Sequence, residues 1–430
     1  MNTHSKHSHA DIILFVLVLV TFFTSLYMKG LNSGIPLHYD DLGYSATVGG
    51  TFVAVFTLAS TVMRLVGGQL TDHFPHFKVL VASLVGSLLG VLFPALWSNF
   101  YVDMASRVIQ GASFALATNV MTVAVMGSAS KKHLGKRVGI KGAGTSLGTM
   151  LGALVATGLL DHRGYQAFYW FYTLLMGLSL GIVYLLHWRE RSWAKAQKNP
   201  DSSAQESEAK TSAIPQATHP TAQKPTGHQG SSSRLRELLA PYFIPDVIPY
   251  LIISFVRRAP KGFCIAFILV FAKHAHIASG ALFFAVVGAA MLACRLLCGK
   301  LFDSDRVWLM MPIFCAQAAG FGLLALFPSF PTLMIAALGY GIAVGTTSPF
   351  IKALTVKGVP KEHWGVVNGE LYFFGDLGKA LGAFLGGVII DGVGKLFIPQ
   401  IAFGFTVITA LGTLFTLLWS QRRGKRRQAV

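Results

Sequence analysis

The sequence has 430 residues, of which 53% are hydrophobic and only 13% are charged, so it is too apolar for a soluble globular protein of this length. Lysine and arginine outnumber aspartate and glutamate by 36 to 18, which gives a formal net charge of +18. The basic residues gather in alternate predicted loops, which argues against a nucleic-acid-binding protein and for a polytopic membrane protein.

Apolar segments long enough to cross a bilayer, about 20 residues each, recur along the chain. Helices are expected, because unpaired backbone groups are costly in hydrocarbon and the alternating pattern of barrel strands is absent. The sequence predicts an all-α protein with twelve membrane-spanning helices. They cover residues 11–34, 45–70, 77–97, 100–127, 138–160, 165–188, 243–272, 278–301, 307–328, 331–356, 365–390 and 396–420.

The basic loops predict the orientation of the chain. The stretches "SKKHLGKR" (130–137), "WRERSWAKAQK" (188–198) and "QRRGKRR" (421–427) fall on one side, whereas "HYDDLGYS" (38–45) and "WSNFYVD" (97–103) fall on the other. By the positive-inside rule, both termini are cytoplasmic. We expect a multi-pass protein of a bacterial cytoplasmic membrane whose basic C-terminal tail contacts anionic lipid.

A change of composition divides the chain into domains. Residues 189–240 are rich in Ser, Ala, Gln, Thr and Pro and cannot bury enough apolar surface to fold, so they are predicted to be a disordered cytoplasmic linker. The predicted domains are a cytoplasmic tail (1–10), a six-helix bundle (11–188), the linker (189–240), a second six-helix bundle (241–420) and a basic tail (421–430).

The two predicted bundles share an internal repeat. "RLVGGQLTD" (64–72) matches "RLLCGKLFD" (295–303) with an offset of 231, since 295 − 64 = 231 and 303 − 72 = 231. "GTMLGALVATGLLD" (148–161) matches "GKALGAFLGGVIID" (378–391) with an offset of 230. Duplicated halves in a twelve-span protein indicate a secondary transporter with its site between the halves.

At these repeats the sequence resembles the major facilitator superfamily, over essentially everything outside the linker and the tails. The resemblance implies two pseudo-symmetric six-helix bundles and a cytoplasmic gate that latches and releases as the halves rock. The family has a basic residue after the gate aspartate, where this chain has His73. The gate residues implied are Arg64, Gly68, Asp72 and Lys78 in the first half and Arg295, Gly299, Asp303 and Arg306 in the second.

Two further stretches resemble antiporters of this family. "RVIQGASFA" (107–115) is similar to their Arg-x-x-Gln-Gly pattern, which implies that Arg107, with Asp103 one turn earlier, takes part in proton coupling. A structural arginine that satisfies helix ends is the alternative. "GTSLGTMLGA" (144–153) resembles a glycine pattern of the fifth helix, but Thr149 replaces its proline, so export is favoured and small-residue helix packing is the other explanation.

Three cations interrupt the seventh predicted span, in "SFVRRAPKGF" (254–263). Arg257 lies about 21 Å along that helix, well inside the hydrocarbon. At the repeat offset, Lys29 of the first helix corresponds to this stretch. We predict that Lys29, Arg257, Arg258 and Lys261 bind an anionic substrate. The alternative is that they neutralise acids elsewhere, and the neighbours Arg257 and Arg258 are not both expected to reach one cavity, since they point about 100° apart.

The eleventh predicted span supplies carboxylates. Glu370 lies near its cytoplasmic end, and Asp376 lies near the middle with Lys379 one turn away. Asp376 is the first candidate for a proton carrier. The competing interpretation is an Asp376–Lys379 pair that only fixes helix packing.

No nucleotide-binding loop and no hydrolase motif is recognisable, so we expect neither an enzyme nor a cofactor. The four cysteines lie in apolar spans, which indicates neither a disulfide nor a metal site. We predict a monomeric, proton-gradient-driven exporter of a small organic anion or amphipathic compound that works in the lipid bilayer and binds no nucleic acid. A proton-coupled importer of a polar metabolite is the alternative, and a membrane receptor or enzyme on the same scaffold is the rival class.

Overall fold

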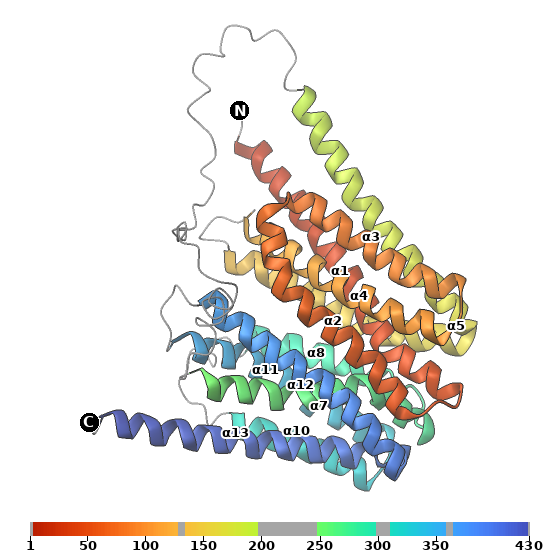
Figure 1. Cartoon of the computed structure of the whole chain (residues 1–430), viewed down its shortest axis with the longest axis vertical. Coiled ribbons are helices and arrows are strands. Elements are labelled where there is room, and N and C mark those ends of the chain that lie inside the picture. Colours follow the sequence, from red (N-terminus) through yellow and green to blue (C-terminus); the bar gives the residue numbers. More distant parts are fainter. Residues whose placement is uncertain (1–2, 128–133, 197–246, 298–309, 358–363, 429–430) are drawn as a thin grey trace, which may run out of the picture.

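The computed structural model describes residues 3–127, 134–196, 247–297, 310–357 and 364–428, which form helices joined by short turns (Figure 1). No strand occurs within these ranges. Most of the predicted linker, residues 197–240, lies outside the described residues, as do the predicted gate residues Gly299, Asp303 and Arg306.

The first half of the chain contributes five helical elements that contain six predicted spans. They are α1 (Thr3–Asp41), α2 (Ala46–His73), α3 (His76–Leu96), α4 (Phe100–Gly127) and α5 (Leu134–Ala196). Within α5, Gly164 has φ 78° and ψ 177°, a backbone conformation that breaks the helix and that glycine tolerates best. The α5 element is therefore two helices, in agreement with the predicted spans at 138–160 and 165–188.

The second half contributes six long helices and one short 3₁₀ turn. They are α7 (Ile248–His274), α8 (Leu282–Leu297), α10 (Met310–Leu326), α11 (Phe330–Lys357), α12 (Trp364–Val393), η4 (Lys395–Phe397) and α13 (Ile398–Gln428). With α5 counted as two, the described residues contain the twelve predicted helices, and the all-α polytopic fold class is confirmed.

Several helices are longer than the predicted spans. The first begins at Thr3, α5 continues to Ala196 and α13 continues to Gln428, so helix extends into both predicted tails and into the start of the predicted linker. Eight segments in the described ranges are long and apolar enough to cross a membrane, one of which contains both helices of α5. The seventh helix is not among them, because three cations interrupt it.

Close helix packing repeats in both halves. The predicted packing role of the glycines in α5 is confirmed, because a Cβ on Gly148 or Gly152 would collide with the backbone of α1. Their repeat counterparts in α12, Gly378 and Gly382, meet the backbone of α7 in the same way. The pairs α1–α5 and α7–α12 are thus equivalent, and they fix the two helices that carry the predicted substrate-binding cations.

Buried phenylalanines hold α7 in place. Phe263, Phe267 and Phe271 recur every fourth residue and are at most 1% exposed, so they form one continuous face of the helix. Lipid tails are as apolar as these rings, so the stabilisation comes from close packing rather than from removal of water.

We call the end of the molecule where α1 finishes at Asp41 and α2 begins at Ala46 the distal end, opposite the two chain termini (Figure 1). A carboxylate from the second half caps a helix of the first half there. Asp391 accepts hydrogen bonds from the backbone amides of Ala46 and Thr47 at 2.7 and 2.9 Å. Ser45 stands at the N-cap position of α2 but makes no side-chain capping bond, so Asp391 supplies the missing cap.

Ion pairs close the distal end further. The carboxylate of Asp40 contacts Nζ of Lys395 at 2.5 Å and Nε2 of His274 at 2.8 Å. The neighbouring Asp41 pairs with Lys273. Acids from the end of α1 therefore meet basic side chains of the second half, and the two bundles are joined on this side.

Candidate functional site

The cations of α7 lie at a seam where α7 and α12 approach each other closely. A Cβ on Gly262 would collide with the backbone carbonyl of Lys379, so only glycine permits this approach. About two turns away, the Ser254 hydroxyl donates to the carbonyl oxygen of Leu371 at 2.8 Å. These contacts bring the arginines of α7 next to the acidic turn of α12.

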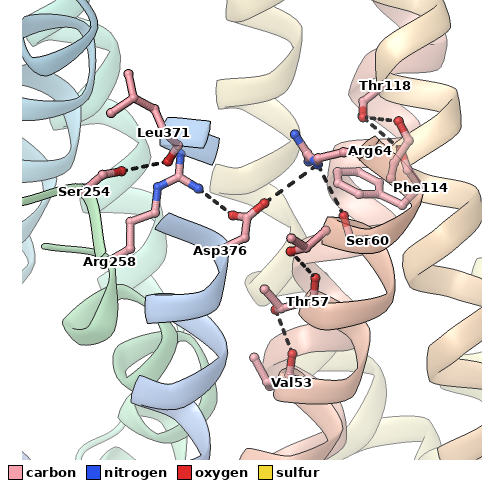
Figure 2. Close-up of polar contacts among 12 residues, drawn as sticks. Val53, Thr57, Ser60, Arg64, Phe114, Thr118, Ser254, Arg258, Leu371 and Asp376 are labelled. Carbon is pink, nitrogen blue, oxygen red and sulfur yellow. Dashed lines mark hydrogen bonds and ion pairs between the residues drawn. The ribbon is translucent and has the colours of Figure 1, made fainter. Parts of the chain in front are cut away.

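Asp376 connects the two halves of the molecule (Figure 2). Its carboxylate contacts Nη1 of Arg258 on α7 at 2.5 Å and Nε of Arg64 on α2 at 3.8 Å. The residue is only 8% exposed, so this is a largely buried arrangement of one carboxylate with two arginines. The competing prediction of an Asp376–Lys379 pair is wrong, because no such ion pair exists among the described residues and Arg258 is the near partner.

A small pocket of about 10 Å³, with room for about one water molecule, lies beside this ion pair. Both arginines of α7 border it, so the expectation that Arg257 and Arg258 do not reach one cavity is wrong. The reason is that Arg258 extends to α12, whereas Nη1 of Arg257 lies 3.5 Å from the Thr347 hydroxyl on α11, and the pocket lies between these helices. Its lining residues are Ser254, Arg257, Arg258, Ser348, Ile351, Leu371 and Tyr372.

Three lysines from three helices lie at other positions in the bundle without an acidic partner among the described residues. Lys29 of α1 is 2% exposed, and its Nζ lies 3.1 Å from the centre of the Phe284 ring on α8. Lys379 of α12 places its Nζ 5.9 Å from the centre of the Phe56 ring on α2. Both contacts are cation–π interactions between the halves. Lys261 is partly buried on α7.

The balance of charge at the centre of the bundle is therefore uneven. Lys29, Arg257, Lys261 and Lys379 have no carboxylate within ion-pair distance in the described part of the chain, and Nε of Arg257 is buried without a hydrogen bond. Buried cations are costly unless an anion compensates them. The arrangement is suited to bind an anion, with arginine forks that match carboxylate or phosphate geometry and lysines that add point charges.

Asp103 and Arg107 lie deep in the first half, at a separate polar cluster. Oδ2 of Asp103 accepts a hydrogen bond from the Tyr39 hydroxyl at 2.7 Å and another from Tyr165. Arg107 is fully buried and donates to the carbonyl oxygen of Leu31 at 2.8 Å. The structure thus gives Arg107 a backbone partner on α1, and its role in proton coupling stays a prediction.

The predicted gate is only partly described. Arg64 reaches Asp376 of the other half, and Lys78 is exposed at the start of α3. Gly68, Asp72 and Arg295 lie in helices, but their surroundings fall outside the described part. Glu370 is buried on α12. The latch between Asp72 or Asp303 and a facing cation therefore stays a prediction.

Sequence reasoning missed Tyr372. Its ring centre lies 5.5 Å from the guanidinium carbon of Arg64 and 5.3 Å from that of Arg258, so it lies between the two arginines that share Asp376. The available signal was its spacing, since Tyr372 and Asp376 are four residues apart and occupy one helix face. No group of three or more metal-ligating side chains occurs within the ranges that the structure describes.

Comparisons with known proteins agree with this architecture. The sequence profile of the Major Facilitator Superfamily matches residues 17–316 and 250–430. The staphylopine export protein of Staphylococcus aureus is 22% identical over 89% of both chains. The riboflavin transporter RibZ of Clostridioides difficile is 24% identical over 40% of this chain and 37% of its own length. The structure of the nucleoside transporter NupG superimposes with a TM-score of 0.71 at 13% identity, over 94% of this chain and 99% of NupG.

Proposed function

The chain belongs to the Major Facilitator Superfamily, and from that premise we propose that it is a secondary active transporter that moves a small organic anion by alternating access. The substrate site that we propose lies between the halves, at Arg257, Arg258, Lys261 and Lys29. An amphipathic anion fits the same site, because aromatic side chains accompany the cations.

The surplus of buried and partly buried cations carries this proposal. Four basic side chains near the middle of the bundle lack a carboxylate partner in the described residues, while Asp376 is already shared by Arg258 and Arg64. A transporter that binds an anion uses such a surplus, because the substrate supplies the missing charge when it enters. A purely structural cluster would instead be stabilised by matched acids.

The energy source in this proposal is the proton gradient, with no cofactor and no catalytic activity. Asp376 is the proposed proton carrier, and Lys379, Glu370, Asp103 and Arg107 are proposed to assist it. The distal end faces outward and the basic termini face the cytoplasm, in the orientation that the positive-inside rule gives for a cell membrane protein. We propose a monomer.

Two directions of transport are candidates. Export is supported by the staphylopine export protein, which matches along 89% of both chains, and by the multidrug efflux pump SdrM of Staphylococcus aureus, which is 22% identical over 41% of this chain. Import of a polar anion is the second candidate. The specific observation that favours it is the contact of Asp376 with two arginines at the proposed substrate site.

The test uses the full chain in proteoliposomes. Fluxes of glycerol 3-phosphate, citrate, riboflavin and the cationic dye ethidium are measured with and without an imposed pH gradient, in both directions. We expect gradient-dependent flux of at least one anion and its loss in Arg257→Ala. The matched control is Lys273→Ala, which removes an exposed cation at the distal end and should retain the flux.

Two results would contradict the proposal. If only ethidium moves, the substrate is not an anion. If an anion moves equally well in Arg257→Ala and in Arg258→Ala, the cations of α7 are structural and the substrate site lies elsewhere.

A further inference from the structure

The contact of Asp376 with the arginines has a consequence for energy coupling, given the proposed anion site on which it rests. We propose that Asp376 occupies the place of the substrate anion, and that a proton on Asp376 and an anion at Arg258 bind cooperatively. The protein then carries the proton and the anion in the same direction.

The geometry places one carboxylate where a substrate carboxylate would bind. Oδ1 of Asp376 lies 2.5 Å from Nη1 of Arg258, and the same arginine lines the adjacent pocket. Arg64 approaches the other carboxylate oxygen at 3.8 Å from the opposite half (Figure 2). The charged and titratable groups around Asp376 are Arg258 and Lys261 from α7, Arg64 from α2, and Lys379 and Tyr372 from α12.

An arginine that holds Asp376 cannot offer the same donors to a second carboxylate. A guanidinium binds carboxylate or phosphate through a planar fork, and the ionised Asp376 occupies Nη1 of that fork. When a proton neutralises Asp376, its attraction for Arg258 falls and the fork can turn to an anion in the pocket. The negative charge that Asp376 loses is replaced by the charge of the substrate.

The reverse argument gives the same sign. An anion bound at Arg258 competes with ionised Asp376 and repels it, so the neutral, protonated form of Asp376 is favoured while the substrate is bound. Thermodynamic linkage requires the two effects to be equal, since each ligand changes the affinity for the other by the same factor. Proton and anion therefore reinforce each other at this site.

Coupling of this sign decides between the two directions of transport. An exchanger of protons for anions needs the two to exclude each other, and at Asp376 a proton admits the anion. A proton gradient directed into the cell would drive the anion inward, so the arrangement favours import. A proton and a substrate cation would exclude each other at Asp376, because both would compete for the same carboxylate.

Proton uptake during binding tests the inference directly. Glycerol 3-phosphate and citrate are added to the purified full-length protein in weakly buffered detergent solution, and the protons taken up per bound anion are measured between pH 6 and pH 8. We expect the wild type to take up more protons than Asp376→Asn with the same probe. The difference between the two proteins removes the contribution of the probe's own titration.

The affinity of Asp376→Asn gives a second, signed readout. Because the amide carries no charge, Arg258 and Arg64 remain available to the anion, so binding at pH 8 should be about tenfold tighter than in the wild type and nearly independent of pH. The matched control is Asp391→Asn, which removes a carboxylate of the same helix at the distal end. It should keep the affinity and pH dependence of the wild type.

The inference is overturned if the wild type releases protons when the anion binds, or if Asp376→Asn binds the anion more weakly with unchanged pH dependence. Either result leaves the proposed function intact, because the anion still binds at the cations of α7. The proposed function fails on a different observation, namely retained flux and binding in Arg257→Ala and Arg258→Ala. If Asp376→Asn does not fold, the wild type alone still tests the inference, because the sign of its proton uptake or release can be measured without the variant.

Discussion

The two halves meet at the distal end and at the centre, and the two meeting places differ in how their charges are matched. At the distal end, Asp40 contacts two basic side chains, Asp41 pairs with Lys273 and Asp391 receives two backbone amides. At the centre, Asp376 alone serves two arginines, and four more cations have no acid in the described residues. The distal contacts are matched within the protein, whereas the central cations outnumber the acids in the described residues, as the proposed anion site requires.

This difference in charge matching predicts different roles for the two meeting places. A set of matched contacts between the halves has its minimum free energy when the halves are closed, so it stabilises one conformation. A set of unmatched cations has its minimum only when a ligand is present, so it stabilises a complex. Variants at the two places should accordingly change different measurements, conformation at one and affinity at the other.

The largest effect is expected at the centre. Arg257→Met should lower anion affinity about 10- to 100-fold, because a charge-assisted hydrogen bond to a ligand contributes about 1.5 to 3 kcal/mol. The same change removes a partly buried cation that has no acid within ion-pair distance in the described residues, so the melting temperature should stay equal or rise. Binding is measured by equilibrium titration and stability by thermal unfolding in detergent.

The matched control for that variant is Arg107→Met. Arg107 donates to the carbonyl of Leu31 and is fully buried, so its loss should lower the melting temperature and leave anion affinity in the folded protein unchanged. If the two variants behave alike, the distinction between arginines that bind the anion and arginines that do not is wrong.

The next effect concerns the distal cap. Asp391→Ala removes the acceptor for the amides of Ala46 and Thr47, and losing a helix cap costs about 1 to 2 kcal/mol. The population open at the distal end should rise about five- to thirtyfold. Spin labels at the exposed positions Leu42 and Leu396 would report this as longer distances. Unchanged distances in Asp391→Ala would show that the cap does not hold the halves together.

A smaller effect is expected for Asp40. Its side chain is 6% exposed and pairs with both His274 and Lys395, so Asp40→Asn weakens two contacts that solvent screens only in part. The open population should rise by a few-fold, which the same pair of spin labels would detect. A shift as large as that of Asp391→Ala would place the main distal contact at Asp40 instead of at the cap.

The smallest effect is expected for Asp41→Asn. The pair of Asp41 with Lys273 is well exposed, with side chains that are 39% and 51% accessible, and exposed pairs contribute about 0 to 1 kcal/mol. Its effect should be within error at 0.5 M NaCl, because salt screens exposed charges. The measurement compares label distances at low and high salt, and a salt-independent shift would contradict this ranking.

Much of the fold could be predicted from the sequence because membrane helices are encoded locally. Apolar length gave the twelve spans, and Gly164 marks the break between two of them. The glycine spacing of Gly148 and Gly152 predicted close helix packing, which their contact with α1 confirms. The ends of the helices were harder to predict from the sequence. The helices α1 and α13 continue beyond their apolar stretches, because polar residues there are still compatible with a helix.

The sequence predicted which residues make up the candidate site, but not which of them form ion pairs with each other. The cations of α7 and the acid of α12 were identified because charges are rare in apolar spans, and rarity is visible in a sequence. Which cation meets Asp376 depends on the approach of α7 and α12 at Gly262, a three-dimensional property. The repeat motif predicted that Arg64 belongs to a gate. Its contact with Asp376 was not predicted, because it too depends on how the helices approach in three dimensions.

Because Asp391 of the second half caps α2 of the first half, separating the halves also removes a cap from α2. When the distal end opens, two amides at the start of α2 lose the acceptors that Asp391 supplies, and Ser45 makes no side-chain capping bond in this structure. Opening toward the outside should therefore fray this turn and raise the hydrogen-exchange rate of Ala46 and Thr47. Those two amides would act as a built-in reporter of which side of the membrane the protein faces.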